Sequence, residues 1–422
     1  MSGMVTQPVK VHPCDAPDGL ISIEQACFQA AAYASVIKEH EEVSLGDALG
    51  RTLALPIRSV MPLPPFDQSA MDGYALEAGG GLPSGTALTI AGRIAAGDRG
   101  QPLPKGSASR ILTGARLPHG ADAVVMQENV ANVGGRIVLT RMVRSGDNIR
   151  RRGEDVEPGE GLFQPGERID ARHIALLAAQ GLERISVRRK VRIGILSTGN
   201  ELRLQGEQLT EVSFFDSNRP MLLALAHQAG ADVLDGGVIR DDPQLIAEAL
   251  SELARHCDLV VTTGGASVGD EDHSMVSLAR ANGRGETLKI ALKPGKPAVV
   301  GVIGRATYLG LPGNPVAALV SWLLLGSAVL AALDGRRSRP LPGMRLPMIH
   351  AFNRRAGRTE FAPARIVHGN GNLAVEILGR GGSARLKPLA AADGLVRIEP
   401  LHAPIAEGDE VMFHPFRDGF SV

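Results

Sequence analysis

The sequence has few cysteines and few aromatic residues, and it has no excess of charge of either sign. Of its 422 residues, 3 are cysteines and 3% are aromatic, while 45 lysines and arginines balance 45 aspartates and glutamates. Cys14, Cys27 and Cys257 share no CxxC spacing, which argues against a disulfide framework and a zinc site. A neutral chain with few stacking rings is not typical of a protein that binds nucleic acid through a basic face. We therefore expect a reduced cytoplasmic compartment, no nucleic-acid partner and local capture of any anionic ligand.

The first residues have no apolar core of the kind found in signal peptides. The one long uncharged run covers residues 316–333 and is followed by four residues, RRSR, at 336–339. Its length is at the lower edge of a membrane span. We interpret it instead as a core helix, because it starts directly from a glycine loop and is rich in small residues, and we expect no membrane partner.

A chain of this length exceeds what one hydrophobic core usually serves, so we expect several domains. Ser22 and Gln25 have the spacing of a capping box, which predicts a helix over 22–37, and a second helix is expected over 44–53. Short alternating runs follow from residue 58, with a hairpin over 127–141 that turns at Gly134 and Gly135. A helix returns after Asp170 and stops at Gly181.

Strands and helices alternate from residue 191. The pattern predicts strands at 192–197, 233–239 and 258–263, separated by helices at 217–229 and 243–256. Such alternation is typical of a doubly wound α/β domain whose parallel sheet is covered on both faces. After residue 340 only short strands and turns are expected. The fold class is therefore α/β multidomain, with an elongated helical domain (20–58 and 146–187), an inserted β-rich domain (59–145), the α/β domain (188–335) and a small C-terminal β domain (340–422).

Two glycine loops follow expected strands in the α/β domain. Gly264, Gly265 and Gly269 lie in TTGGASVGDED, and LGLPGNP precedes the helix of residues 316–333. Glycines let a ligand approach the backbone, and a helix N-terminus attracts anions. With Lys293 and Lys296 of KPGKP between them, the two loops predict a site for a phosphate-bearing ligand. Ordinary tight turns and solvated lysines are the alternative interpretation.

Acidic residues follow the first glycine loop. Asp270, Glu271 and Asp272 are the oxygen donors that Mg²⁺ prefers when it also binds ligand phosphates. The alternative is a solvated acidic helix N-terminus, which the helix dipole stabilises. His273 alone is interpreted as a surface or capping residue.

Further upstream, polar residues lie in turns. Ser69 and Asp72 lie in FDQSAMDGYAL, Thr113 precedes a glycine in RILTGA, and Arg150 opens RRRGEDV, which contains Asp155. Structural turns and an exposed salt-bridge cluster are the ordinary interpretation of these segments.

Taken together, eight motifs resemble the MoeA family of molybdopterin molybdenumtransferases, which is related to the gephyrin E domain. In order they are PPFDQSAMDGYAL, RILTGARLPHGADAVVMQE, RRRGEDV, GILSTGNEL, DSNRPML, TTGGASVGDEDH, KPGKP and LGLPGNPVAALVSW. The resemblance covers residues 20 to about 420. It implies a four-domain homodimer whose α/β domain resembles the molybdopterin-adenylyltransferase fold, with the active site between that domain and domains of the partner subunit.

The resemblance also implies an activity. Members of the family insert molybdenum from molybdate into molybdopterin, consume adenylylated molybdopterin and release AMP in a Mg²⁺-dependent step. Because no adenylyltransferase domain is fused, a separate molybdopterin adenylyltransferase is expected to supply the substrate, and molybdenum apoenzymes or their chaperones are expected to receive the product. The preference between molybdate and tungstate does not follow from the sequence, because the two oxyanions have nearly equal size and charge.

Residue roles are implied by the same resemblance. Asp272 and Glu201 are similar to the acidic groups that engage Mg²⁺ or the reacting phosphate, and Asp72 and Asp155 are expected to be catalytic with them. The substrate-binding set is Ser69, Thr113, Arg150, Gly264, Gly265, Ser267, Lys293, Lys296, Pro312, Asn314, Arg358 and Arg365. Ala266, Glu271 and His273 depart from the usual family residues.

Two other functions stay open on the sequence. The first is a non-catalytic relative that binds molybdopterin or acts as a scaffold, and the second is molybdopterin adenylylation with ATP. The intact acidic residues and lysines argue against the first, and the extra domains outside 188–335 argue against the second.

Overall fold

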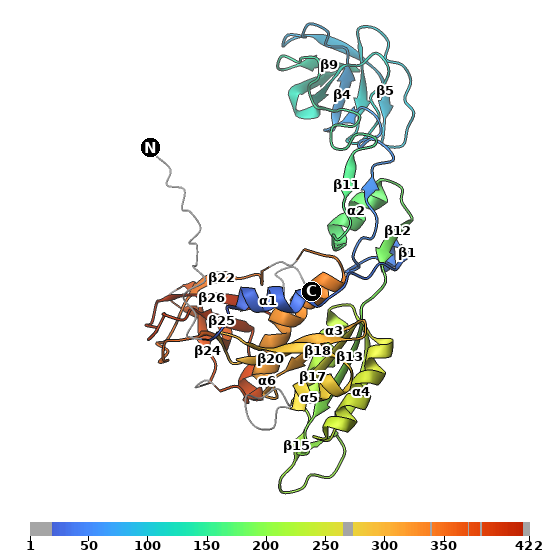
Figure 1. Ribbon diagram of the computed structural model, residues 1–422. Coiled ribbons are helices and arrows are strands. Elements are labelled where there is room, and N and C mark those ends of the chain that lie inside the picture. Colours follow the sequence, from blue (N-terminus) through green and yellow to red (C-terminus); the bar gives the residue numbers. More distant parts are fainter. Residues whose placement is uncertain (1–18, 265–272, 338–339, 370, 380–381, 417–422) are drawn as a thin grey trace. The chain divides into compact units, whose positions relative to one another are not determined.

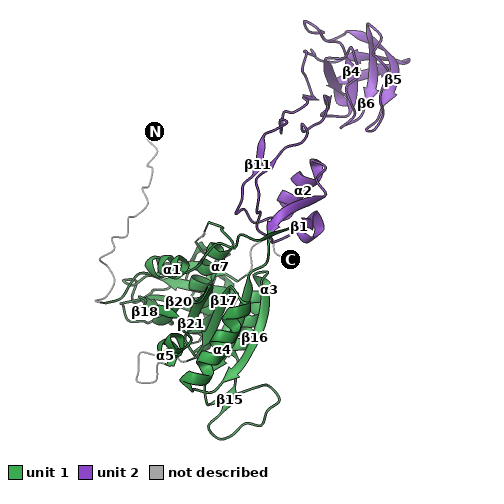
Figure 2. Cartoon of the chain, turned by 45° about the vertical axis from the view of Figure 1, so that its right-hand side comes forward, with its two compact units in different colours: residues 1–41, 188–422 green, residues 42–187 purple. Residues whose placement is uncertain are grey.

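The computed structural model describes residues 19–264, 273–337, 340–369, 371–379 and 382–416. The chain divides into two compact units, unit 1 with residues 1–41 and 188–422 and unit 2 with residues 42–187 (Figure 2). The α/β multidomain class expected from the sequence is confirmed, while the four domain boundaries stay a prediction.

Unit 1 is built on a six-stranded sheet. Its order is β16 (Asp232–Ile239), β13 (Arg192–Thr198), β17 (Leu259–Thr263), β21 (Ala306–Leu311), β20 (Pro297–Ile303) and β18 (Arg284–Lys289). The first four strands are parallel, as expected. The sequence predicts a parallel sheet, but β20 runs antiparallel to both β21 and β18. A short connection, residues 304–305, joins β20 to β21, and a connection that short permits only an antiparallel pair.

Helices cover both faces of this sheet (Figure 1). Side chains alternate along each strand, so Leu259 and Val261 face one core cluster and Val260 faces the other. The first cluster contains α1 (Ile23–Ala32), α3 (Asn218–Gln228), α6 (Pro315–Ser321) and α7 (Ser327–Leu333). The second contains α4 (Pro243–His256) and α5 (His273–Arg280). The central strands of the sheet are therefore buried on both sides.

Local capping fixes two of these helices. The Ser22 hydroxyl and Gln25 form the expected capping box at the start of α1, although the helix ends at Ala32 and not at residue 37. The Asp242 carboxylate accepts hydrogen bonds from Gln244 N and Leu245 N before Pro243 starts α4. Both N-termini follow side-chain chemistry that is visible in the sequence.

The apolar run of residues 316–333 is a helix, as expected. Residues Pro315–Leu333 form α6, a π-helical stretch η3 (Trp322–Gly326) and α7, with mean hydropathy 2.3. Length and composition would allow this helix to cross a membrane, but 78% of it is buried inside unit 1. The core-helix interpretation is therefore supported by its packing.

A second sheet in unit 1 is formed mainly by the C-terminal residues. Its strands are β22 (Met344–Pro347), β23 (Thr359–Gly369), β24 (Asn372–Ile377), β25 (Gly394–Ile398) and β26 (Glu410–Pro415). The expectation of short strands alone is wrong, since β23 has 11 residues and a helix, α8 (Leu386–Ala390), follows β24. The strand β19 (Leu292–Lys293) pairs in parallel with β23, so KPGKP is tied to the C-terminal sheet.

Unit 2 contains a third six-stranded sheet. Its order is β7 (Ala123–Met126), β4 (Gly73–Leu76), β6 (Ser107–Ile111), β5 (Ala87–Ile94), β9 (Arg136–Leu139) and β8 (Val130–Val133). The predicted hairpin is confirmed, with Gly134 and Gly135 both at positive φ between β8 and β9. A short 3-10 turn, η2 (Gln127–Asn129), precedes β8.

The remainder of unit 2 consists of short strand pairs and one helix. The pairs are β1 (His40–Ser44) with β12 (Arg184–Arg188), β2 (Ile57–Arg58) with β11 (Gly161–Phe163), and β3 (Gln68–Ser69) with β10 (Ile149–Arg150). The Asp170 side chain caps α2 (Ala171–Ala179), as predicted.

The helix expected over 44–53 is wrong. Only a single 3-10 turn, η1 (Leu45–Asp47), forms there. Gly46 lowers the helix propensity of the segment, and the Ser44 hydroxyl caps the short turn by accepting a hydrogen bond from Asp47 N. Gly50 adopts a φ of +75°, which an α-helix does not allow.

Candidate functional site

An open cavity of about 1110 Å³ lies in unit 1, between the edge of the α/β sheet and the C-terminal sheet. The three parallel strands β13, β17 and β21 end at the same level, because Ser197 pairs with Thr263 and Thr263 pairs with Leu311. The three loops that follow β13, β17 and β21 therefore begin side by side. Thr198, Gly199, Glu201, Gly264, Pro312, Gly313 and Asn314 from these loops all line the cavity.

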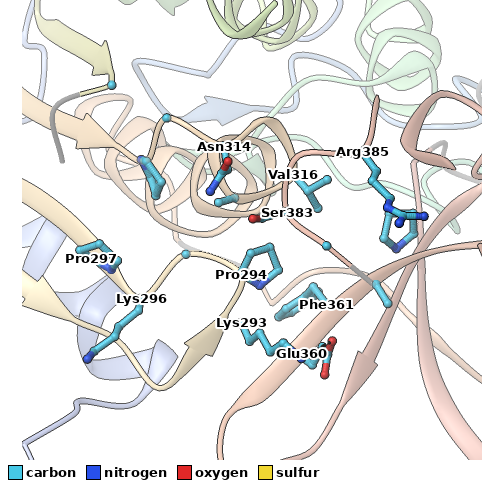
Figure 3. A pocket seen from close by; sticks show the side chains of 18 of the residues that line it. Lys293, Pro294, Lys296, Pro297, Asn314, Val316, Glu360, Phe361, Ser383 and Arg385 are labelled. Carbon is cyan, nitrogen blue, oxygen red and sulfur yellow. Dashed lines mark ion pairs between the residues drawn. The ribbon is translucent and has the colours of Figure 1, made fainter. Parts of the chain in front are cut away.

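KPGKP reaches the same edge for a different reason. Strand β20 runs in the opposite direction, so its first residues lie beside the last residues of β21, with Val299 opposite Gly310. The loop before β20 is thus placed next to loops that come after their strands. Lys293, Pro294, Gly295, Lys296 and Pro297 line the cavity as a result (Figure 3).

Gly264 is the glycine of TTGG that the structure explains most directly. Its φ is +96°, and a Cβ atom there would lie 2.2 Å from the carbonyl oxygen of Thr198. Both facts exclude any larger residue. Gly264 thus lets the loops after β13 and β17 approach each other at the cavity.

Asn218 connects the end of β17 with the loop that follows β21. Its side-chain nitrogen Nδ2 donates to Thr263 Oγ1 at 2.9 Å and to the Gly313 carbonyl at 2.7 Å. Thr263 Oγ1 in turn donates to the Pro312 carbonyl at 3.1 Å. Asn218 is buried at the start of α3 and belongs to DSNRPML, a segment for which sequence reasoning gave no role. It holds the PGN loop against the end of β17.

The N-terminus of α6 has fewer free N–H groups than the sequence predicts. Asn314 is the N-cap and Pro315, the first helical residue, has no N–H group. The N–H of Val316 donates to the Ser383 carbonyl at 3.0 Å. Two of the first-turn positions therefore offer no donor to an anion, which corrects the expectation of a helix end with free N–H groups.

The two lysines of KPGKP differ in their surroundings. Lys293 Nζ lies 3.1 Å from Glu360 Oε1, and Glu360 is also 3.4 Å from the buried guanidinium of Arg354. Figure 3 shows Lys293 directed toward Glu360, whereas Lys296 extends away from this pair. The structure therefore gives Lys293 a local partner, while no ion pair is found for Lys296 among the described residues.

The C-terminal part of unit 1 supplies further cavity residues. Arg358 lines the cavity and donates from Nη1 to the Leu292 carbonyl at 3.1 Å. Ser383 and Arg385 also line it, and sequence reasoning missed both. Arg365, which was expected to face the site, is not among the lining residues and pairs with Glu376 at 2.7 Å.

Three carboxylates line the cavity in the described part of the chain, and Glu360 among them pairs with Lys293. Glu201 was expected, and Asp241 was missed. Asp241 Oδ2 accepts a hydrogen bond from Asn200 N at 3.0 Å, so it lies next to the loop that carries Glu201. The signal was present in the sequence, because Asp241 comes two residues after the end of β16, at the carboxyl edge.

Some predicted residues lie outside the described ranges. These are Gly265, Ser267 and Asp272, together with Ala266, Gly269, Asp270 and Glu271. His273, which follows them, begins α5 and lines the cavity. Within the described ranges no group of three or more His, Cys, Asp or Glu side chains could hold a metal ion.

Unit 2 brings Asp72 and Thr113 together. Asp72 Oδ1 accepts from both the N–H and the hydroxyl of Thr113, each at 2.7 Å. These hydrogen bonds hold the pKa of Asp72 below its ordinary value. Ser69 is buried and its hydroxyl donates to the Met71 carbonyl at 2.5 Å, so the structure gives it a local role in the turn.

Arg150 ends β10, and Asp155 lies in the loop that follows it. Arg150 Nε is 2.7 Å from Glu154 Oε1, as expected of a salt-bridge cluster. The N–H of Asp155 donates to the Leu63 carbonyl at 3.0 Å, and its side chain is exposed. The substrate contacts expected of Ser69, Thr113 and Arg150, and the catalytic roles expected of Asp72 and Asp155, stay predictions.

Comparison with known proteins adds a consistent set of similarities. Three family models match: the MoeA N-terminal region (domain I and II) at residues 21–181, a probable molybdopterin binding domain at 194–332, and the MoeA C-terminal region (domain IV) at 345–416. The molybdopterin molybdenumtransferase of Haemophilus influenzae is 33% identical over 402 residues, which cover 94% of this chain and 99% of that protein. The molybdopterin molybdenumtransferase of a Nostoc species is 32% identical over 336 residues, or 78% of this chain and 77% of that protein.

A solved structure is similar over the same length. The crystal structure of a molybdopterin biosynthesis MoeA protein from Pyrococcus horikoshii superposes with a TM-score of 0.76 and 28% sequence identity. The alignment covers 94% of this chain and all of that one.

Proposed function

Because this chain belongs to the MoeA family, we propose that it transfers molybdenum to molybdopterin in the synthesis of the molybdenum cofactor. The observation that carries the proposal is the unit 1 cavity, in which two lysines and two arginines converge with three carboxylates. A ligand that combines phosphate groups with a metal needs both kinds of side chain in one place.

The substrates that suit this cavity are molybdate and adenylylated molybdopterin. Lys293, Lys296 and Arg385 would bind the oxyanion and phosphate groups, since these side chains are cationic and reach the cavity from different loops. Asn218 would keep the loops in place, and Gly264, which lines the cavity, would let the substrate approach the backbone. AMP leaves when molybdenum enters the product.

Glu201 and Asp241 would hold Mg²⁺. Their oxygens suit this ion, which typically takes one or two carboxylates and completes its shell with phosphate oxygens and water. When bound, Mg²⁺ neutralises charge that develops on the phosphate as AMP leaves. Asp272 would join this set from outside the described ranges, as the family resemblance implies.

The residues of unit 2 belong to the proposal through the family resemblance alone. Asp72, Thr113, Arg150 and Asp155 would act on the same substrate in a homodimer, and light scattering of the purified protein tests the dimer. We also propose a cytoplasmic location, a separate adenylyltransferase as the source of substrate, and apoenzymes or their chaperones as recipients. Copurification of tagged protein with these partners from cytoplasmic extract is the corresponding test.

The experiment that tests the proposed activity is anaerobic incubation of the protein with adenylylated molybdopterin and Mg²⁺, with and without molybdate. We expect molybdate-dependent release of AMP, matched by molybdenum in the pterin product. Tight binding with no AMP release would contradict the proposal in favour of a non-catalytic relative. Formation of adenylylated molybdopterin from ATP would contradict it in favour of the preceding step.

A further inference from the structure

One aromatic side chain in the cavity has no role in the chemistry described so far. Phe214 lines the cavity and is 57% exposed, whereas Phe361, the other phenylalanine in the lining, is 2% exposed. Aromatic residues make up only 3% of the chain. A phenylalanine ring left open to the cavity therefore offers a face that the fold itself does not use.

The position of Phe214 is fixed by its backbone. Its N–H donates to the Glu201 carbonyl at 3.0 Å, within the short parallel pair of β14 (Leu202–Arg203) and β15 (Phe214–Phe215). Two residues later, Asp216 is almost fully buried and accepts hydrogen bonds from Asn218 N and Arg219 N. The backbone that carries the ring is thus held between the loop that contains Glu201 and the start of α3.

The next residue provides a contrast. Phe215 is 41% exposed, but it does not line the cavity. Consecutive residues of a strand point to opposite sides, so only one of the two rings can face the ligand. Both rings are partly exposed to solvent, so their orientation decides which of them lines the cavity.

The charged side chains of the cavity suit the anionic groups of a ligand, but they leave its flat ring without a partner. An exposed aromatic face recognises a heteroaromatic ring by stacking, which tolerates different ring substituents. We propose that Phe214 is the stacking platform for a heteroaromatic ring of the substrate, an inference that rests on the proposed function. Two rings share this chemistry, the pterin of molybdopterin and the adenine of AMP.

Binding measurements test the proposal separately from metal insertion. Wild type, Phe214→Ala, Phe214→Tyr and the matched control Phe215→Ala would each be titrated anaerobically with AMP, molybdopterin and molybdate by calorimetry. Loss of one stacking contact predicts that Phe214→Ala weakens binding of one ring-bearing ligand about 10-fold. Phe214→Tyr keeps the ring and should bind as wild type does, while molybdate binding should be equal in all four proteins.

The ligand that loses affinity identifies the ring, with AMP reporting adenine and molybdopterin reporting pterin. Unchanged binding of both ligands by Phe214→Ala would overturn the proposal. An equal loss in Phe214→Ala and Phe215→Ala would also overturn it, because the effect would then belong to the strand pair or to a contact between copies of the chain. These binding results do not depend on AMP release, so failure of the proposed activity leaves them interpretable.

Discussion

The unit 1 cavity and the unit 2 loops that contain residues 67–72, 113 and 150–155 both gather charged side chains, but only the unit 1 cavity has a buried carboxylate, Glu360, among them. Glu360 is 5% exposed and lies between Lys293 and the buried Arg354. In unit 2 the corresponding ion pair joins Asp67 and Arg151, whose side chains are 38% and 51% exposed. Burial makes the first arrangement part of the folded core, while water screens the second.

The origin of the two arrangements also differs. The cavity draws on segments more than 180 residues apart in the chain, from Thr198 to Pro388, and the sheet edge brings them together. The unit 2 loops contact one another through short strand pairs such as β3 with β10. Substitutions in unit 1 should therefore combine effects on stability and ligands, whereas those in the unit 2 loops should leave the fold nearly unchanged.

The largest effect is expected for Glu201→Gln, which removes a charged oxygen donor from the cavity. Loss of a metal-holding carboxylate should lower molybdate-dependent AMP release at least about 100-fold, because charge on the departing phosphate is no longer neutralised. The control is Glu211→Gln, which changes an exposed glutamate in the segment that follows Glu201. Equal activity of the two variants would remove Glu201 from the metal site.

Gly264→Ala and Gly114→Ala compare a crowded glycine with an open one. Both residues have positive φ, but only at Gly264 does the added Cβ meet another atom within 4 Å, the Thr198 carbonyl at 2.2 Å. We expect a loss of roughly 3 kcal/mol for Gly264→Ala and about 1 kcal/mol for Gly114→Ala. Fluorescence of Trp322, the single tryptophan, reports unfolding of unit 1 in urea, and circular dichroism reports the other variant. Similar losses would show that the contact between the two loops is not tight.

Glu360→Gln and Asp67→Asn compare the buried and exposed ion pairs directly. Glu360→Gln leaves the buried Arg354 guanidinium without a counter-charge, which should cost about 3 kcal/mol. Asp67→Asn should cost less than about 1 kcal/mol, since solvent screens its pair with Arg151. Urea unfolding measures both, and equal costs would contradict the contrast between the two regions.

The smallest effect concerns the pH dependence of unit 2. Hydrogen bonds from Thr113 lower the pKa of Asp72 from 3.8, so the carboxylate stabilises the folded state above that pH. The contribution is lost as the pH falls through the lowered pKa. Asp72→Asn should therefore be slightly less stable than wild type at neutral pH, and the difference should shrink below about pH 4. Thermal unfolding across pH measures this, with Thr113→Val expected to reduce the pH dependence only in part.

Much of the fold could be predicted because it depends on neighbours in the chain. The capping residues Ser22, Asp170 and Asp242 and the glycine pair at 134–135 act over three or four positions. The helix expected over 44–53 does not form, because the conformations of Gly46 and Gly50 outweigh the apolar spacing of this segment. The reversed β20 was missed because the direction of a strand depends on pairing with a distant partner.

The sequence predicted which kinds of residue form the site better than it predicted which residues contact one another there. Glu201, Lys293, Lys296 and Asn314 were found, because each follows or precedes a strand in a glycine or proline loop. Ser383 and Arg385 were missed, because no local pattern distinguishes them from surface residues, whereas Asp241 was missed although it follows the carboxyl end of a strand. Asp272 and the rest of the TTGGASVGDED loop were predicted from sequence and await their test by activity.

The sequence by itself determined the alternation of strands and helices, the caps that bound several helices and the glycines that permit tight loops, because these follow from the local conformational preferences of a few residues. Only the tertiary structure decided that Glu360 pairs with Lys293, that Ser383 covers the start of α6 and that Phe214, not Phe215, lines the cavity. Those contacts depend on strand register and on the packing of two sheets, which bring residues far apart in the chain within hydrogen-bonding distance.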